Sequence, residues 1–86
     1  MLKYPLLIVN LKTYFESLDN ALEIGRIAKK VSEETGIEIV LTPSHISLKA
    51  ISKIIKTFSQ SIDLVELGAH TGSIVAEEVK KAGALG

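Results

Sequence analysis

Short aliphatic runs alternate with longer amphipathic segments along the chain. Residues 5–11 are almost continuously apolar, and Pro5 stands at the start of the run, where a missing backbone N–H matters least. Residues 37–42 form a second run, which Pro43 ends. Continuous rather than alternating apolar residues are typical of parallel strands that are buried on both faces. The pattern predicts strands over 5–11 and 37–42, and a third strand over 57–60.

Three helices are predicted between and after these strands. In residues 19–35, apolar side chains recur at i, i+3, i+4 and i+7 and form a stripe of Ile24, Ile27, Ala28 and Val31. Gly36 stands where a glycine commonly ends a helix. The second helix covers about 47–53, with Ser47 as its cap. The third covers 75–82, and Gly83 stops it.

The resulting order is strand, helix, strand, helix, strand, helix, and then at 84–86 the start of a fourth strand. This alternation predicts an α/β fold with a parallel sheet. Strands that are apolar on both faces need cover on both, which either an open sheet between helices or a closed (β/α)8 barrel provides. Three units cannot close a barrel. The pattern therefore leaves two readings for the single domain 1–86, a small three-layer domain or part of a larger fold.

Composition narrows the classes of function. The chain has 86 residues, of which 47% are hydrophobic, and ten basic residues balance ten acidic ones. This balance argues against a nucleic-acid partner. The absence of cysteine excludes a disulfide framework, a thiol nucleophile and a zinc finger, and is consistent with the cytoplasm. No apolar run approaches the roughly 20 residues that cross a bilayer, so no membrane partner is expected.

Two polar residues interrupt the first apolar run at its carboxyl end. Asn10 and Lys12 are two apart, so a regular strand would place them on one face. Ligands of parallel α/β folds bind beyond the carboxyl ends of the strands, and this pair could hold an anionic substrate there. The alternative is a lysine that simply reaches solvent. The loop 68–72, which precedes a helix and carries His70, could bind phosphate through backbone N–H groups, or it could be an ordinary flexible loop.

The other polar residues point less clearly to chemistry. His45 is interpreted as a solvated loop residue, and Asp63 as a loop cap rather than a site residue. No His and carboxylate spacing matches a metal site, so no metal is expected. Paired charges on the helices are interpreted as solvated, namely Lys29, Lys30, Glu33, Glu34, Glu77, Glu78, Lys80 and Lys81.

Taken together, these motifs resemble the N-terminal part of triosephosphate isomerase in its shorter archaeal form. Residues 7–14 read Leu-Ile-Val-Asn-Leu-Lys-Thr-Tyr and resemble the opening strand of the family with its Asn-x-Lys. Residues 58–63 resemble the archaeal Phe-Ala-Gln-His-Ile-Asp, although Ser59 and Ser61 depart from its Ala and His. The loop 68–72 and the tail 78–86 resemble the third loop and the third helix. The resemblance implies a (βα)3 part of a (β/α)8 TIM barrel.

The resemblance also implies roles for individual residues. Lys12 resembles the active-site lysine, which holds the substrate phosphate and stabilises the negative enediolate, and Asn10 resembles the substrate-positioning asparagine beside it. Gln60 matches a supporting glutamine of the third strand. The tip of the loop that braces the active site of a neighbouring subunit, and so implies a homo-oligomer, corresponds to His70, Thr71 and Gly72.

The implied activity is the interconversion of dihydroxyacetone phosphate and glyceraldehyde 3-phosphate in glycolysis and gluconeogenesis, in the cytoplasm and without cofactor or metal. In the family, the electrophilic His, the Glu base and the phosphate loops lie beyond the position of Gly86, and neither His45 nor His70 matches that His. We therefore predict that the 86 residues alone are an inactive fragment. The alternatives are a non-catalytic association module, half of a split barrel, or a small α/β phosphate-binding domain.

Overall fold

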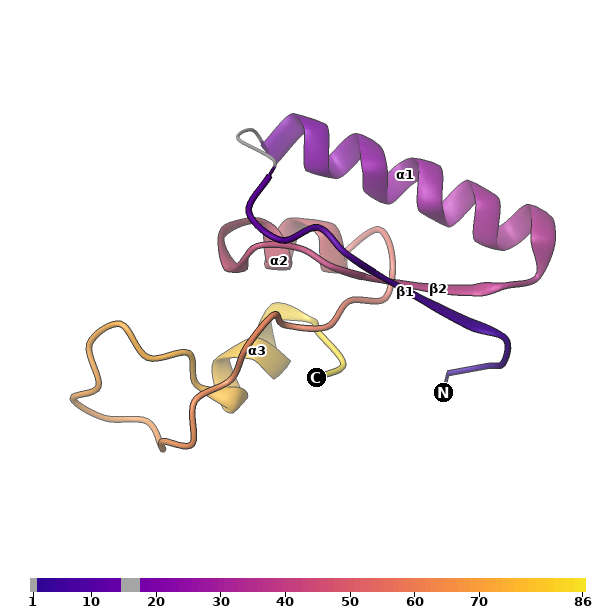
Figure 1. Ribbon diagram of the computed structural model, residues 1–86. Coiled ribbons are helices and arrows are strands. Elements are labelled where there is room, and N and C mark those ends of the chain that lie inside the picture. The colour runs from indigo at the N-terminus through magenta and orange to yellow at the C-terminus, as the bar shows by residue number, and fades with distance from the viewer. Residues whose placement is uncertain (1, 15–17) are drawn as a thin grey trace.

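The computed structural model describes residues 2–14 and 18–86 (Figure 1). Two strands and three helices are defined in these residues: β1 (Leu6–Asn10), α1 (Leu18–Thr35), β2 (Glu38–Thr42), α2 (His45–Ser52) and α3 (Ala76–Ala82). β1 and β2 pair in parallel, with Leu6 opposite Glu38 and Asn10 opposite Thr42. The helix α1 connects them and runs along the pair (Figure 1). The first two predicted strands and the three predicted helices are confirmed in kind and order.

The helix ends agree with the prediction except at the start of α2. Gly36 and Gly83 follow α1 and α3 with φ of +74° and +110°, the left-handed backbone that favours glycine after a helix. The predicted start of the second helix is wrong by two residues, because α2 begins at His45. Ser44 occupies its cap position and accepts the backbone N–H of Ser47 at its carbonyl, so Ser47 lies inside the helix rather than at its cap.

The predicted third strand, 57–60, is reduced to one parallel bridge between Leu41 and Thr57. The backbone N–H of Leu41 donates to the carbonyl of Lys56 at 3.1 Å, and that of Phe58 donates to the carbonyl of Leu41 at 2.9 Å. The next donor from the β2 side would be residue 43, which is proline and has no N–H. Pro43 therefore stops the ladder after a single bridge, and the full (βα)3 order is not formed in the described residues.

The predicted start of a fourth strand lies beside this bridge. The backbone N–H of Leu85 donates to the carbonyl of Thr57 at 2.8 Å, and that of Ser59 donates to the carbonyl of Gly86 at 2.6 Å. Backbone pairing thus proceeds in chain order, from β1 to β2, then to 57–59, and then to 85–86.

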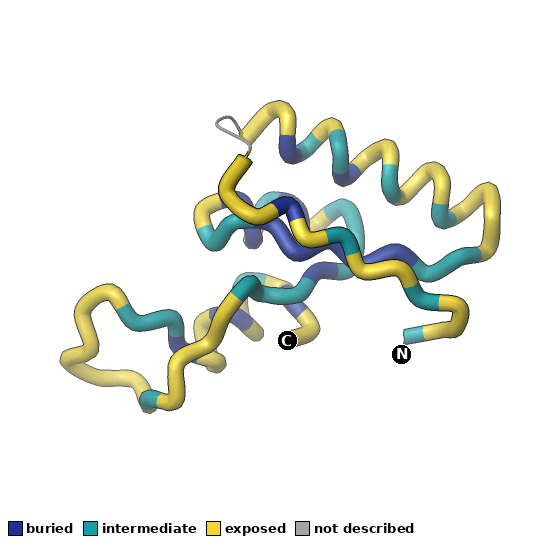
Figure 2. Tube along the Cα trace, viewed as in Figure 1, coloured by how far each residue is buried: buried dark blue, intermediate teal, exposed yellow. Residues whose placement is uncertain are grey.

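The main core lies where α1, β2 and α2 meet, and Figure 2 shows the buried positions gathered there. The buried residues of this cluster are Ala21, Ile39, Leu41 and Ile51. Gly25 faces α2 from α1, and a Cβ at this position would meet Ile51 at 3.7 Å, an ordinary van der Waals contact, so the packing of the two helices does not require a glycine here. A second cluster joins α2 to α3 and the C-terminal residues through Leu48, Val79 and Ala84.

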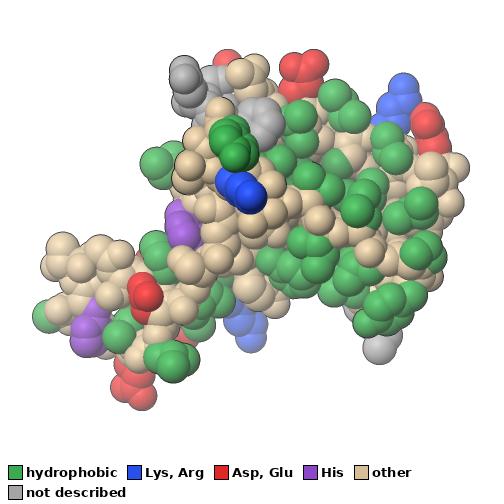
Figure 3. Space-filling view, in the orientation of Figure 1, with side chains coloured by type: hydrophobic (Ala, Val, Ile, Leu, Met, Phe, Trp, Pro, Cys, Tyr) green, Lys and Arg blue, Asp and Glu red, His purple; other side chains and the backbone are tan. Residues whose placement is uncertain are grey.

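In contrast to β2, β1 is only partly buried. Leu7 and Ile8 keep about half of their surface exposed, at 50% and 51%, so the prediction of burial on both faces is wrong for this strand. Ile27 and Val31 of the predicted helix stripe are exposed as well, whereas Ile24 packs on the core. Figure 3 shows that hydrophobic side chains gather on the face of the molecule turned to the viewer. The second edge of β1 also has no partner strand among the described residues. None of the described helices is long and apolar enough to span a bilayer.

One ion pair joins the start of β2 to the segment after α2. The Glu38 carboxylate accepts the Lys56 ammonium at 3.1 Å and the backbone N–H of Lys3 at 3.2 Å. The hydrogen bond from Lys56, assisted by the N–H and positive charge of Lys3, outweighs partial burial and holds the pKa of Glu38 below its usual range.

Folding lowers this pKa, so the ionised carboxylate stabilises the fold above the ordinary glutamate pKa of about 4.3. The stabilisation is lost as pH falls through the lower pKa of the folded state. We expect Glu38→Gln to flatten the acid side of the stability curve, measured as the thermal midpoint between about pH 3 and about pH 7. Glu34→Gln, at an exposed position of α1, is the control and should keep the acid dependence. An unchanged acid dependence in Glu38→Gln would contradict the assignment.

Candidate functional site

The candidate site begins where β1 ends. The Asn10 side-chain oxygen accepts the backbone N–H of Lys12 at 2.9 Å, a side-chain turn that asparagine readily forms. Lys12 has φ of +53°, the only positive φ of a non-glycine residue in the described chain. Such a backbone costs about 1–2 kcal/mol for an ordinary side chain. The strand alternation therefore stops at Asn10, and a turn rather than the pleat places Lys12, whose side chain is exposed.

Gln60 fastens this turn to the neighbouring strand. Its side-chain nitrogen donates to the carbonyl oxygen of Lys12 at 2.9 Å and to that of Thr42, the last residue of β2, at 3.2 Å. Two carbonyl oxygens face this atom, so the amide must present its NH₂ group to them rather than its oxygen. The structure thus brings Asn10, Lys12 and Gln60 together at the carboxyl end of β1.

His45 is not a freely solvated loop residue, contrary to the prediction from sequence. It is the first residue of α2, is half-buried, and its Nε2 lies 3.0 Å from the Ser59 hydroxyl and 3.3 Å from the carbonyl of Ser61. The Ser59 hydroxyl in turn donates to the Ser61 carbonyl at 2.7 Å. Sequence reasoning missed this cluster because its members are 14 and 16 residues apart.

The glycine-bearing loop projects away from the strands (Figure 1). Asp63 closes its base: its backbone N–H donates to the carbonyl of Ile74 at 2.8 Å, and its carboxylate accepts the N–H of Ile74 at 2.7 Å. The interpretation of Asp63 as a loop cap is therefore confirmed.

The tip of this loop is a tight turn. The N–H of Ser73 donates to the carbonyl of His70 at 3.0 Å, and Gly72 has φ of +85° at the position where this turn favours glycine. His70, Thr71 and Gly72 are all exposed, and in the described chain they are separate from the group around Lys12. Leu64, near the base, has its side chain fully in solvent.

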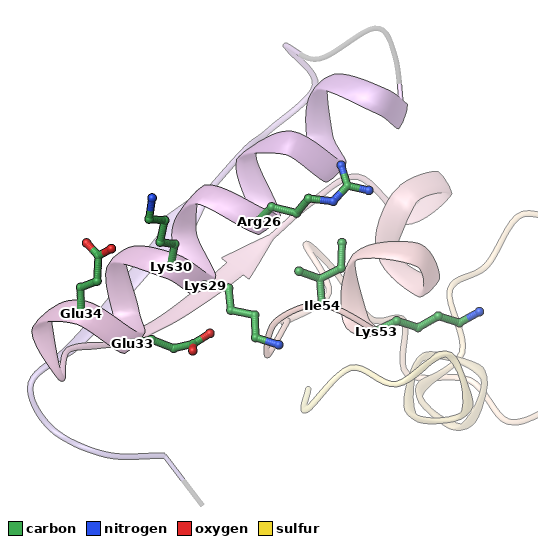
Figure 4. A pocket seen from close by; sticks show the side chains of 7 residues that line it. All are labelled: Arg26, Lys29, Lys30, Glu33, Glu34, Lys53 and Ile54. Carbon is green, nitrogen blue, oxygen red and sulfur yellow. The ribbon is translucent and has the colours of Figure 1, made fainter.

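The charged residues of the helices do not build a second site. A hollow of about 460 Å³ between α1 and the end of α2 is lined by six charged side chains and Ile54. In Figure 4, Lys30 and Glu34 extend away from Ile54, so the charges do not converge on one point. The interpretation of the paired helix charges as solvated is confirmed, because all of them are exposed. Within residues 2–14 and 18–86, no group of three His, Asp or Glu side chains could hold a metal ion.

Known proteins match this chain over nearly its whole length. The model of the triosephosphate isomerase family matches residues 5–86. The archaeal triosephosphate isomerase of Methanothermus fervidus is 40% identical over 85 residues, which are 95% of this chain and 38% of that enzyme. The enzyme of Methanocaldococcus jannaschii is 44% identical over 84 residues, 94% of this chain and 38% of its own length. The enzyme of Methanopyrus kandleri is 40% identical over 91 aligned residues, which cover 100% of this chain and 40% of that enzyme. This chain therefore spans less than half the length of the relatives it matches.

Proposed function

The chain belongs to the triosephosphate isomerase family, and from this premise we propose that its residues serve the interconversion of dihydroxyacetone phosphate and glyceraldehyde 3-phosphate. The observation that carries the proposal is the held turn at Lys12. Its backbone N–H is bound by Asn10, and its carbonyl is bound by Gln60, at the carboxyl end of β1. Ligands of parallel α/β folds bind at this end of the strands.

The proposed role of Lys12 follows from the charge that the reaction creates. Removing a proton next to a carbonyl builds negative charge on the oxygen of an enediolate, while the substrate phosphate is already an anion. A fixed ammonium group stabilises the charged state more than the neutral carbonyl and so lowers the barrier. In the described residues Lys12 forms no ion pair, which leaves its charge available to the substrate. Asn10 and Gln60 support the backbone from which this side chain extends.

The proton transfers themselves require groups that this chain does not carry at the matching positions. His45 is bound to Ser59, and His70 lies in the projecting loop. We propose that the base and the electrophile come from the part of the barrel that corresponds to the remaining length of the relatives. The same part would pair with the open edge of β1 and cover Leu7 and Ile8, which are half exposed. Triose phosphate is the proposed substrate, with no cofactor, in the cytoplasm.

The projecting loop is proposed to contact a second subunit. Its tip at 70–72 is a defined turn rather than a loose segment, and the closed base at Asp63 holds it away from the strands. Leu64 and Leu67 offer apolar surface beside it, at 102% and 57% exposure. A loop with a closed base, a turn at its tip and exposed leucines is suited to contact with a neighbouring molecule, which supports a homo-oligomer of the assembled barrel.

The proposal is tested by completing the barrel with a relative. In this chimera, residues 1–86 are joined to the part of the Methanothermus fervidus enzyme that follows its matched segment. We expect isomerase turnover from the chimera in a coupled assay, because Lys12 would then face the missing groups. The 86 residues alone should give no turnover above background, since a base and an acid each contribute about 10²–10⁴-fold. A chimera that unfolds cooperatively but gives no turnover would contradict the proposal, as would turnover from the 86 residues alone.

A further inference from the structure

We propose that His45 is a positioning residue for Lys12, acting through Ser59 and Gln60. The inference rests on the proposed function of Lys12 and extends it to the first residue of α2. The contacts form a continuous path from Nε2 of His45 to the Ser59 hydroxyl, along the backbone to Gln60, and from the Gln60 amide to the carbonyl of Lys12. None of these groups other than Lys12 is assigned a contact with substrate.

The first step of the path has a defined direction. The Ser59 hydroxyl gives its hydrogen to the Ser61 carbonyl at 2.7 Å, so toward His45 it can only accept. Nε2 of His45, 3.0 Å from the Ser59 oxygen, must therefore carry the hydrogen. The Ser61 carbonyl, 3.3 Å from the same nitrogen, is also an acceptor and agrees with this tautomer. His45 thus donates to both ends of the segment 59–61.

In the second part of the path, hydrogen bonds of Ser59 and Ser61 hold the backbone on both sides of Gln60. The hydroxyl of Ser59 closes a turn onto the carbonyl of Ser61, and the backbone N–H of Ser59 is bound to the carbonyl of Gly86 at 2.6 Å. Because Pro43 ends the pairing with β2 after a single bridge, strand hydrogen bonds do not hold residues 59–61 against β2. His45, Ser59 and Ser61 replace them with side-chain contacts.

The third step transmits this order to Lys12. Gln60 binds the carbonyl of Lys12 while Asn10 binds its N–H, so both peptide groups of the strained residue are held. A long glutamine side chain loses rotamer freedom on making such contacts, and a fixed backbone at residue 60 reduces that cost. Loosening 59–61 would therefore loosen the Gln60 contact and the positive-φ turn together.

The test follows hydrogen exchange in the ¹⁵N-labelled 86-residue chain. In His45→Ala we expect exchange of the Gln60 side-chain amide to rise about fivefold, the effect of one lost hydrogen bond, and the Lys12 amide resonance to shift. Exchange at the buried backbone amides of Val40 and Leu41 should stay unchanged, which separates positioning from a general loss of structure. His45→Gln, which keeps an N–H donor, should restore the slow exchange at Gln60.

Ser59→Ala keeps α2 intact and tests the same path should His45→Ala fail to fold. It should reproduce the faster exchange at Gln60. Ser32→Ala is the matched control, because it also removes a hydroxyl that donates to a backbone carbonyl, that of Ile37 at 2.6 Å, but near the end of α1, and it should change nothing at Gln60. Unchanged exchange at Gln60 in Ser59→Ala, or a parallel rise at Leu41, would overturn the proposal, as would fast exchange in the unaltered chain. The readout does not depend on turnover, so its failure and the failure of the chimera are distinguishable.

Discussion

Replacing Lys12 by alanine in the chimera is expected to lower kcat/KM by about 10²–10³-fold, the loss typical of removing one group that stabilises a developing oxyanion. The backbone of Lys12 is held at the carboxyl end of β1 by hydrogen bonds to its N–H and to its carbonyl, so the point from which its side chain extends does not depend on the substrate. We expect kcat to fall because the enediolate loses a cation, and KM to rise because the phosphate loses one too. Steady-state kinetics in both directions of the isomerisation measure the two effects.

Lys49→Ala is the matched control for this prediction. Lys49 lies exposed on α2, away from the turn at Lys12, and the same charge is removed. Its kcat/KM should stay near that of the parent chimera. A Lys12→Ala chimera that retains the parent kcat/KM would show that Lys12 is only a solvated lysine, the alternative that the sequence alone left open.

Leu41→Ala is expected to destabilise the chain by about 2–5 kcal/mol, the cost of deleting a buried leucine side chain. Leu41 is completely buried between α1 and α2 and is also the residue through which β2 pairs with Thr57. Small domains have only about 5–15 kcal/mol of stability, so this loss would remove a large share of it. The change is measured as a shift of the urea midpoint at constant slope.

Leu64→Ala makes the same substitution where the side chain is fully exposed. It should change stability by no more than about 0.5 kcal/mol, as is usual for surface positions. An equal effect of the two substitutions would contradict the assignment of Leu41 to the core. If both substitutions changed stability equally and the unaltered chain were itself barely stable, the chain would be loosely packed and would not have the described fold.

The elements that could be predicted from sequence are those whose signal is local. The two aliphatic runs, the periodic stripe of α1 and the glycines after α1 and α3 each lie within a few residues of the structure they predict. The third strand could not be predicted correctly from its own residues. Its length depends on Pro43, which directly follows the neighbouring strand β2 and lacks the donor needed for the next hydrogen bond.

In the candidate site, too, some features could be predicted from sequence and others could not. Asn10 and Lys12 were predicted from their position at the end of an aliphatic run and from the resemblance to a family. Spacing by itself predicted a shared strand face, whereas the turn that holds Lys12 depends on Gln60, 48 residues away. His45 was misinterpreted because a histidine after a proline gives no sign of the two serines it contacts 14 and 16 residues later.

By itself, the sequence determined the family, the alternation of strands and helices, and the residues that end the first strand, because each is encoded in a short stretch or in several short stretches in order. Only the tertiary structure decided how much of each strand is buried, where the third strand stops and how Lys12 is held. These depend on hydrogen bonds between residues that are distant in the chain, and such bonds form only when the fold brings a particular donor to a particular carbonyl.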